Sequence, residues 1–197
     1  MGYKRILRDL KAMIQYPIWS LKKEGPDNHY YKVNRIRKIA KNYKCTDFIE
    51  TGTFYGQTIW KVKDIFSKVF SVEFYEPLYL YNIEQFKDNK NVKIFYGDSS
   101  VKLSEMVAQT NGKILFWLDG HYSGEGTGLS KKTSPIIEEL DVIKASLKND
   151  CCIVIDDKRL FNGTDGYPTY DETINKLKGI NPNFNLVQDG DAIIALI

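Results

Sequence analysis

The alternation of strand-like and helix-like segments is the feature that most restricts what this chain can fold into. Short apolar runs alternate with stretches whose apolar residues have helical spacing. Strands are expected at 46–50, 69–73, 92–96, 114–119, 151–155, 184–187 and 192–197. Helices are expected between them at 57–66, 77–87, 101–109, 135–147 and 170–178, with Ser134 as N-cap and Pro135 as first residue of the fourth. The pattern predicts an α/β fold with a doubly wound, mostly parallel seven-stranded sheet. An Asp-Gly pair at 189–190 predicts that the sheet closes with a C-terminal antiparallel hairpin.

Size and composition narrow the class of protein. The 197 residues suffice for one well-buried domain with an extension, and 43% hydrophobic and 27% charged residues are typical of a globular protein. No apolar run approaches the roughly 20 residues that span a bilayer, and no signal-peptide pattern is present, so a cytoplasmic protein without a transmembrane segment is expected. Cys45, Cys151 and Cys152 adjoin predicted strands and are interpreted as small buried thiols.

The basic character of the chain is confined to its N-terminal part. Residues 1–44 carry twelve Lys or Arg against three acids, a balance of +9, so the remainder is at −6 for a total of +3. An amphipathic basic helix is expected over 4–18 and interrupted near Pro17, with a linker at 24–28 and a second basic helix at 32–43. We therefore expect a helical extension, 1–31, before a domain, 32–197. The first helix could contact an anionic membrane surface, its own domain, or a second subunit in a homodimer.

The stretch 46–56 predicts a binding loop between the first strand and its helix. A ligand can approach a glycine backbone closely, and two glycines follow the acid that ends the strand. The order Glu-x-Gly-x-x-x-Gly matches neither the dinucleotide fingerprint nor a P-loop. It resembles the first motif of class I S-adenosylmethionine-dependent methyltransferases. That resemblance, which covers residues 32–197, implies that the amino-acid end of the cofactor lies on Glu50, Thr51, Gly52, Thr53, Phe54 and Gly56.

Acids also end the following strands, where ligands of open parallel sheets bind. Glu73 comes 21 residues after Gly52, the separation at which a carboxylate can accept hydrogen bonds from both ribose hydroxyls. Phe74 beside it is assigned to the same site. The resemblance places Asp98 and Ser99 near the adenine amino group, and Asp119 at the cofactor as well.

Three carboxylates, Asp119, Asp156 and Asp157, follow two strands that are expected to be neighbours. In a partly desolvated cleft they would repel one another unless a cation or protons neutralise them. The pattern resembles metal-dependent O-methyltransferases of the catechol and macrocin types, which implies Mg²⁺ on these three residues. Alternatively, Asp156 or Asp157 only caps a turn. His121 is the candidate general base acting with Asp119, and a substrate-contacting histidine is the alternative.

These residues together predict methyl transfer from S-adenosylmethionine to a hydroxyl of a small molecule or of a sugar or glycan precursor, assisted by Mg²⁺. The stretch 119–123 and the glycine-rich segment after it resemble methyltransferases of polysaccharide biosynthesis. The segment 122–133 is expected to act as a lid, and 158–168, with Arg159, Phe161 and Tyr167, to shape acceptor specificity.

Two other functions stay open. An NAD-type oxidoreductase or nucleotide-sugar enzyme lacks its glycine fingerprint here. A non-catalytic binding module would use the basic N-terminus, but no pattern of base-stacking aromatics accompanies it, so no nucleic acid is expected.

Overall fold

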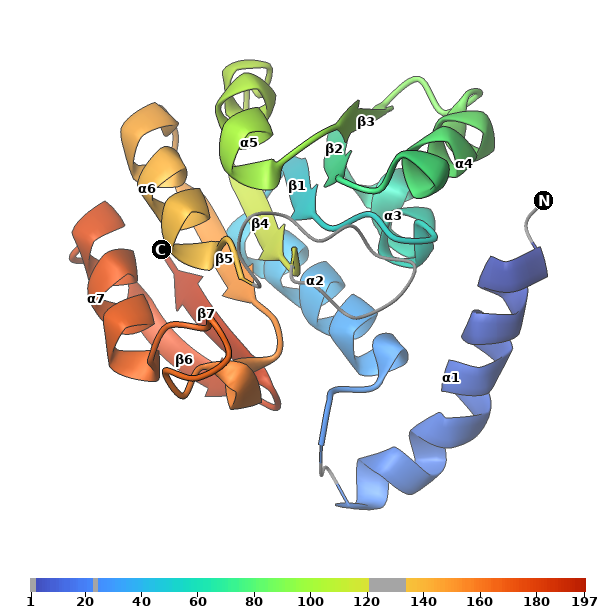
Figure 1. The fold of residues 1–197 in the computed structure, drawn as a ribbon, viewed down its shortest axis with the longest axis horizontal. Helices are drawn as coiled ribbons and strands as arrows, with labels where there is room; N and C mark the ends of the chain where they lie inside the picture. Colours follow the sequence, from blue (N-terminus) through green and yellow to red (C-terminus); the bar gives the residue numbers. More distant parts are fainter. Residues whose placement is uncertain (1–2, 23–24, 121–133) are drawn as a thin grey trace.

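The computed structural model describes residues 3–22, 25–120 and 134–197, which form a sheet covered by helices (Figure 1). The strands are β1 (Asp47–Thr51), β2 (Lys68–Glu73), β3 (Val92–Tyr96), β4 (Ile114–Leu118), β5 (Cys151–Ile155), β6 (Asn185–Asp189) and β7 (Ala192–Leu196). The helices are α1 (Tyr3–Lys22), α2 (His29–Tyr43), α3 (Gln57–Val62), α4 (Glu76–Phe86), α5 (Ser99–Ala108), α6 (Ile136–Ser146) and α7 (Tyr170–Ile180). Short 3₁₀ turns follow α3 at Lys63–Ile65 and β5 at Lys158–Leu160.

The strand order β3-β2-β1-β4-β5-β7-β6 confirms the predicted doubly wound sheet. The first five strands are parallel, and in the centre Ile49 pairs with Phe70 on one side and Phe116 on the other. The last strand, β7, lies between β5 and β6 and is antiparallel to both. The order reverses between β1 and β4, so the carboxyl ends of these two strands border a crevice in which ligands of such sheets bind.

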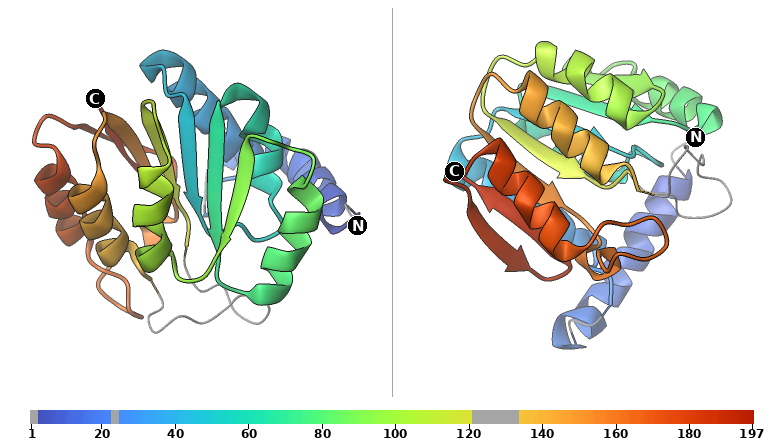
Figure 2. Two further views of the ribbon diagram at one scale, coloured as in Figure 1. Left: turned by 90° about the horizontal axis from the view of Figure 1, so that it is seen from above. Right: turned by 60° about the vertical axis from the view of Figure 1, so that its left-hand side comes forward.

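Helices cover both faces of the sheet because the strand residues alternate between two cores (Figure 2). Ile49, Phe116 and Ile153 pack with α5, α6 and α7. Phe48 and Trp117 point to the other face, where α2, α3 and α4 contribute the apolar side chains. Every residue of β1, β4 and β5 is buried, as expected for parallel strands covered on both sides.

Capping residues shift several helix starts from their predicted positions. α2 begins three residues early, because the Asn28 side chain in the expected linker accepts the Tyr30 N–H. α5 begins at Ser99 because Asp98 caps it in the same way. The predicted Ser134 cap is wrong: α6 starts at Ile136, and Pro135 occupies the N-cap position.

α1 differs from the expectation in two respects. It continues through Pro17 to Lys22 without the predicted break, since Pro17 lies on the exposed side where the carbonyl it leaves unbonded can reach water. It also packs on the domain through its polar side, where Arg8 bonds Gln57 and Asp9 pairs with Lys61.

The apolar side of α1 faces away from the domain, so α1 makes the predicted contact with its own domain through polar and aromatic side chains instead. Its exposed apolar side chains are Ile6, Leu7, Leu10, Met13, Ile14, Ile18 and Leu21. Contact of this side with a membrane surface or a second subunit stays a prediction. None of the helices in the described residues is long and apolar enough to cross a bilayer.

Candidate active site

The two glycines of the loop after β1 occupy positions that no other residue fits without strain. Gly52 has φ +86°, and a Cβ there would lie 2.7 Å from the carbonyl oxygen of Asp119. Gly56 has φ +68°, and its Cβ would lie 2.6 Å from the Asn82 side chain. The loop therefore packs closely against the end of β4. Gly52 has no side chain at the place where the cofactor was predicted to bind.

Glu73 orders this loop through its carboxylate. Its two oxygens accept the N–H groups of Phe54 and Tyr75 at 2.8 and 2.9 Å. Burial raises the pKa of Glu73, and these backbone bonds partly oppose the rise. Phe74, next to it, is half exposed at the same edge. The structure thus places the predicted ribose-binding acid beside the glycine loop, 19 residues from Phe54 in sequence but in contact with it.

Glu50 lies beneath the loop in a buried hydrogen-bonded chain. The Ser71 hydroxyl donates to its carboxylate at 2.8 Å, and Ser71 also bonds the Thr53 hydroxyl at 2.7 Å. Desolvation raises the pKa of Glu50 to about 8, against hydrogen bonds that lower it. The side chain is therefore neutral at pH 7 and supports the loop from below.

Thr51, at the end of β1, and Asp98, after β3, each hold a backbone segment at this edge of the sheet. The Thr51 hydroxyl accepts the Asp119 N–H at 3.2 Å. One Asp98 oxygen accepts the Ser100 N–H and hydroxyl at 2.9 and 2.6 Å, and Ser99 is the first residue of α5. Both predicted adenine-side residues thus lie at the helix start that follows β3.

Asp119, Asp156 and Asp157 come together, as their positions after β4 and β5 predicted. One carboxylate oxygen of each lies within 4.8 Å of the others. Burial is the largest influence on the pKa of Asp119, which rises to about 6, and on that of Asp156, which rises to about 7. Neighbouring carboxylates add to the rise, and the Lys32 ammonium opposes it. Ionisation of these two carboxyls is therefore costly in this surrounding.

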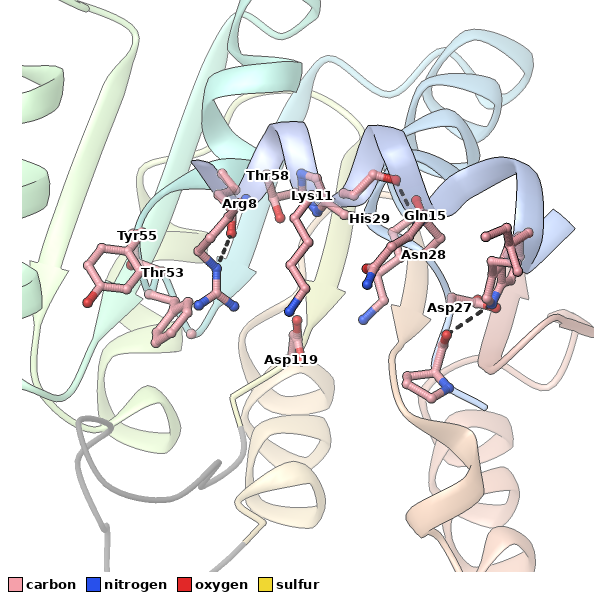
Figure 3. A pocket seen from close by; sticks show the side chains of 18 of the residues that line it. Arg8, Lys11, Gln15, Asp27, Asn28, His29, Thr53, Tyr55, Thr58 and Asp119 are labelled. Carbon is pink, nitrogen blue, oxygen red and sulfur yellow. Dashed lines mark hydrogen bonds between the residues drawn. The ribbon is translucent and has the colours of Figure 1, made fainter. Parts of the chain in front are cut away.

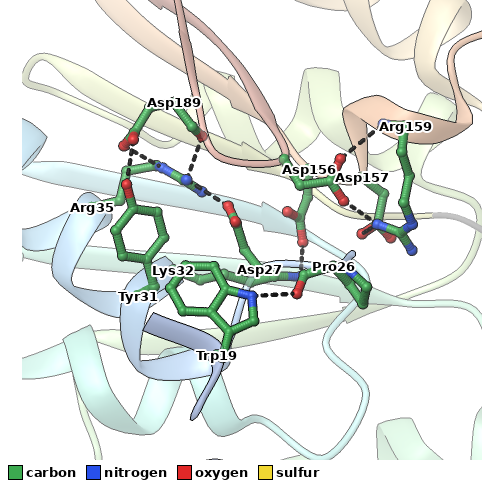
Figure 4. Close-up of polar contacts among 11 residues, drawn as sticks. Trp19, Pro26, Asp27, Tyr31, Lys32, Arg35, Asp156, Asp157, Arg159 and Asp189 are labelled. Carbon is green, nitrogen blue, oxygen red and sulfur yellow. Dashed lines mark hydrogen bonds and ion pairs between the residues drawn. The ribbon is translucent and has the colours of Figure 1, made fainter. Parts of the chain in front are cut away.

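A lysine from α2 compensates part of this charge, and the sequence analysis missed it. The Lys32 ammonium pairs with Asp156 Oδ2 (Figure 4). Burial would lower the pKa of Lys32, but the Asp119, Asp156 and Asp157 carboxylates raise it above its usual value. A signal was present: Lys32 precedes the buried Ile36 and Ile39 by four and seven residues, so it lies on the inner side of α2.

Arg159 is the second cation at this edge. Its guanidinium bonds Asp157 Oδ1 at 2.6 Å and also pairs with Asp191, whose carboxylate accepts the Arg159 N–H at 2.8 Å. Asp157 has φ +56°, so these bonds fix a strained turn directly after β5. Arg159 was predicted to shape acceptor specificity, but these bonds give it a structural task.

The hairpin β6–β7 is tied to α2 by Arg35, which is itself buried. The guanidinium bonds Asp27 at 2.5 Å and Asp189 at 3.0 Å, and the Tyr31 hydroxyl donates to Asp189 (Figure 4). A Cβ at Gly190 would lie 2.4 Å from Asp27, so only glycine fits this contact. The network fixes α2, which carries Lys32, against the β6–β7 hairpin. The hairpin in turn pairs with β5, the strand that Asp156 follows.

The structure adds Glu139 to the site, in a small recess that Phe161 and Tyr167 also line. Glu139 is buried, and burial raises its pKa to about 7. Its carboxyl lies against the backbone of Gly120, since a Cβ added to Gly120 would be 3.0 Å from Glu139 Oε1. Its spacing of three from Ile136 puts it on the buried side of α6. Phe161 is part of the core, and Tyr167 packs on it; both border this recess together with Asp119 and Asp156.

α1 roofs a cavity of about 870 Å³ above this edge of the sheet (Figure 3). The floor comes from the loop at Gly52–Tyr55 and from Asp119, and the roof from α1 and the segment that follows it. His29 also lines the cavity. Burial lowers its pKa to about 4, so its imidazole is neutral. The predicted base His121 and the predicted lid 122–133 lie outside the described residues.

No family model matches the sequence, and a search of curated proteins finds no match. Solved structures do resemble the fold. The O-methyltransferase TomG from Streptomyces achromogenes, solved with S-adenosylmethionine, is 12% identical with a TM-score of 0.60, over 95% of this chain and 87% of that one. The Podospora anserina methyltransferase PaMTH1, bound to S-adenosylhomocysteine, is 13% identical with a TM-score of 0.57, over 97% and 86%. The N-methyltransferase NodS from Bradyrhizobium japonicum WM9 is 10% identical with a TM-score of 0.56, over 84% and 93%. The chain has the class I methyltransferase fold.

Proposed function

We propose that the protein transfers a methyl group from S-adenosylmethionine to a hydroxyl of a small molecule or of a sugar or glycan precursor, as in polysaccharide biosynthesis. The observation that carries this proposal is the meeting of the glycine loop, Glu73 and the three-carboxylate cluster at one edge of a methyltransferase sheet. The similar structures include O- and N-methyltransferases, so the fold alone leaves the acceptor atom open. The choice of oxygen rests on the carboxylate cluster.

In this proposal the glycine loop and two acids hold the cofactor. The bare backbone at Gly52 lets the amino-acid end approach, Glu73 accepts the ribose hydroxyls, and Asp98 lies toward the adenine. S-adenosylmethionine, when bound, supplies an electrophilic methyl group on sulfur. The chain must then hold the acceptor hydroxyl in line with that methyl and provide a place for its proton, the part proposed for Asp119 and His121.

The carboxylate cluster suits a divalent cation in its donor set. Carboxylate oxygens are preferred ligands of Mg²⁺, and Asp156 Oδ1 is buried without a hydrogen-bond partner among the described residues. Asp119, Asp156 and Asp157 would hold the ion, which when bound lowers the pKa of a coordinated hydroxyl. Lys32 already pairs with the other Asp156 oxygen, so the ammonium and the metal would compete for the same charge.

Calorimetric titration with S-adenosylmethionine, with NAD⁺ as control and each with and without Mg²⁺, tests this function. We expect micromolar binding of S-adenosylmethionine and none of NAD⁺. The double variant Asp156→Asn, Asp157→Asn should abolish Mg²⁺-dependent methylation of hydroxyl acceptors and leave cofactor affinity nearly unchanged.

The matched control for this variant is Asp64→Asn, Asp88→Asn, which removes the same charge from exposed positions. Loss of cofactor binding in the Asp156, Asp157 variant alone would instead assign these residues to the cofactor. Absence of S-adenosylmethionine binding in every condition would refute the enzymatic proposal.

A further inference from the structure

The cavity beneath α1 lies where an acceptor must bind if the proposed function holds. It shares Gly52, Thr53, Phe54 and Asp119 with the predicted cofactor site. Its opposite wall is the polar side of α1. An acceptor seated between these walls would have a hydroxyl near Asp119 and the rest of its surface against α1.

The described lining of this cavity carries an excess of positive charge. Its cations are Arg8, Lys11, Lys22 and Lys32, and its acids are Asp27 and Asp119. Asp27 is buried and paired with Arg35. Lys32 is committed to the carboxylate cluster through Asp156.

Arg8 and Lys11 are the cations that remain available next to the glycine loop. Among the described residues neither has a carboxylate partner, because the nearby acid of α1, Asp9, pairs with Lys61 at 3.0 Å. Both side chains extend from α1 toward the floor of the cavity, Lys11 in the direction of Asp119 (Figure 3). Two unpaired cations on one helical turn form an anion-binding pair.

Arg8 is held in place before any ligand binds. Its Nε donates to Gln57 Oε1 at 2.9 Å, and its guanidinium carbon lies 4.5 Å from the centre of the Phe54 ring. These contacts fix the plane of the guanidinium and leave the terminal nitrogens to a ligand. A planar, oriented guanidinium beside a lysine suits the oxygens of a phosphate.

A neutral polar group accompanies the pair. The buried His29 Nε2 has no hydrogen-bond partner among the described residues. Burial is the main cause of the low pKa of His29. The Asp9 carboxylate opposes the shift, and the cations Lys32, Lys61 and Arg8 add to it. A ligand oxygen could take the hydrogen bond that His29 lacks.

We propose that this cavity binds an acceptor that carries a phosphate group, held by Arg8 and Lys11 above the glycine loop. The inference rests on the proposed methyl transfer and specifies its substrate class. The phosphate could belong to a soluble phosphate or diphosphate ester or to a lipid-linked glycan, since the recognising chemistry is the same. The carboxylate of the cofactor itself is the rival ligand for these two cations.

The test is titration of inorganic pyrophosphate into the protein with and without S-adenosylhomocysteine. Compared with the unmodified protein, the variant Arg8→Gln, Lys11→Met should bind pyrophosphate about ten- to a hundredfold more weakly, the range expected for lost hydrogen bonds to a charged group. Its affinity for S-adenosylhomocysteine should stay unchanged. The control Lys41→Met, Lys90→Met removes two exposed charges outside the cavity and should bind both ligands normally.

Cosedimentation with phosphatidylglycerol vesicles, with phosphatidylcholine vesicles as reference, distinguishes a lipid-borne phosphate. Binding only to the anionic vesicles, lost in the Arg8, Lys11 variant, would support a lipid-linked acceptor. Equal pyrophosphate and vesicle binding by variant and control would overturn the inference, as would a loss of S-adenosylhomocysteine affinity in the variant. Failure of the unmodified protein to bind S-adenosylhomocysteine would instead refute the proposed function.

Discussion

The buried carboxyl of Glu50 should make the stability of this protein fall with rising pH. Its pKa in the folded protein is about 8, against an ordinary value of 4.5, because burial disfavours the charged form. Since the folded state holds this proton more tightly, the stabilisation is fully present below pH 4.5. It is lost as the pH rises through about 8. The change Glu50→Gln keeps a neutral side chain of similar shape and removes the titration.

The two pKa values set the size of the effect. Between pH 5.5 and pH 7.5 the unfolded carboxyl is ionised and the folded one mostly protonated. Glu50 alone should then reduce the free energy of unfolding by roughly 2 to 3 kcal/mol over this range, since each pH unit contributes at most about 1.4 kcal/mol. Other buried acids, such as Glu139 and Asp156, titrate in both proteins and cancel in the difference between them.

Urea unfolding of both proteins at several pH values between 5 and 8 measures that difference. We expect the curves of unfolding free energy against pH to separate by roughly 2 to 3 kcal/mol as the pH rises from 5.5 to 7.5, because the unmodified protein loses stability that the Glu50→Gln protein keeps. Parallel curves would refute the reasoning, because they would mean that Glu50 is ionised in the folded protein.

Two substitutions test the neighbouring features. Lys32→Met leaves Asp156 without its ammonium partner and should cost about 3–5 kcal/mol of stability at pH 7.5, part of which added Mg²⁺ should recover. Urea unfolding with and without Mg²⁺ measures both effects. An unchanged stability would contradict the role of Lys32. Gly52→Ala forces a Cβ against the Asp119 carbonyl and should destabilise by more than about 1 kcal/mol while weakening cofactor binding. Gly25→Ala is the control, because Gly25 also has a positive φ, +72°, but its Cβ would have nothing within 4 Å. It therefore measures the backbone strain without the steric clash. An equal loss of stability in both variants would mean that the clash at Gly52 contributes nothing.

The sequence predicted those parts of the fold and the site that depend on local pattern. Apolar runs buried on both faces identified the parallel strands, and the shared edge of a parallel sheet was enough to bring Asp119, Asp156 and Asp157 together. The identity of their cationic partners could not be predicted with the same ease. Lys32 reaches the cluster from α2, and that contact depends on how α2 crosses the sheet.

The orientation of α1 shows a second limit of pattern. Helical periodicity identifies an apolar side, and burial of that side is the usual outcome. Here the surface that receives α1 is polar, with Gln57 and Lys61 of α3 meeting Arg8 and Asp9. The polar contacts among these four residues turn the basic side of the helix over the cavity and leave its apolar side outward.

The charges at the carboxyl edge link the fold to its proposed chemistry. Within the described residues, Asp119, Asp156, Asp157 and Asp191 meet two cationic side chains, Lys32 and Arg159. Two negative charges are left over when all four acids are ionised, and protons or one divalent cation would balance them. The raised pKa values of Asp119 and Asp156 favour protons as the balancing charge. The buried Asp156 Oδ1, which has no hydrogen-bond partner among the described residues, would suit a divalent cation. If the proposed Mg²⁺ binds here, it would displace protons from these carboxyls, so its affinity should increase with pH.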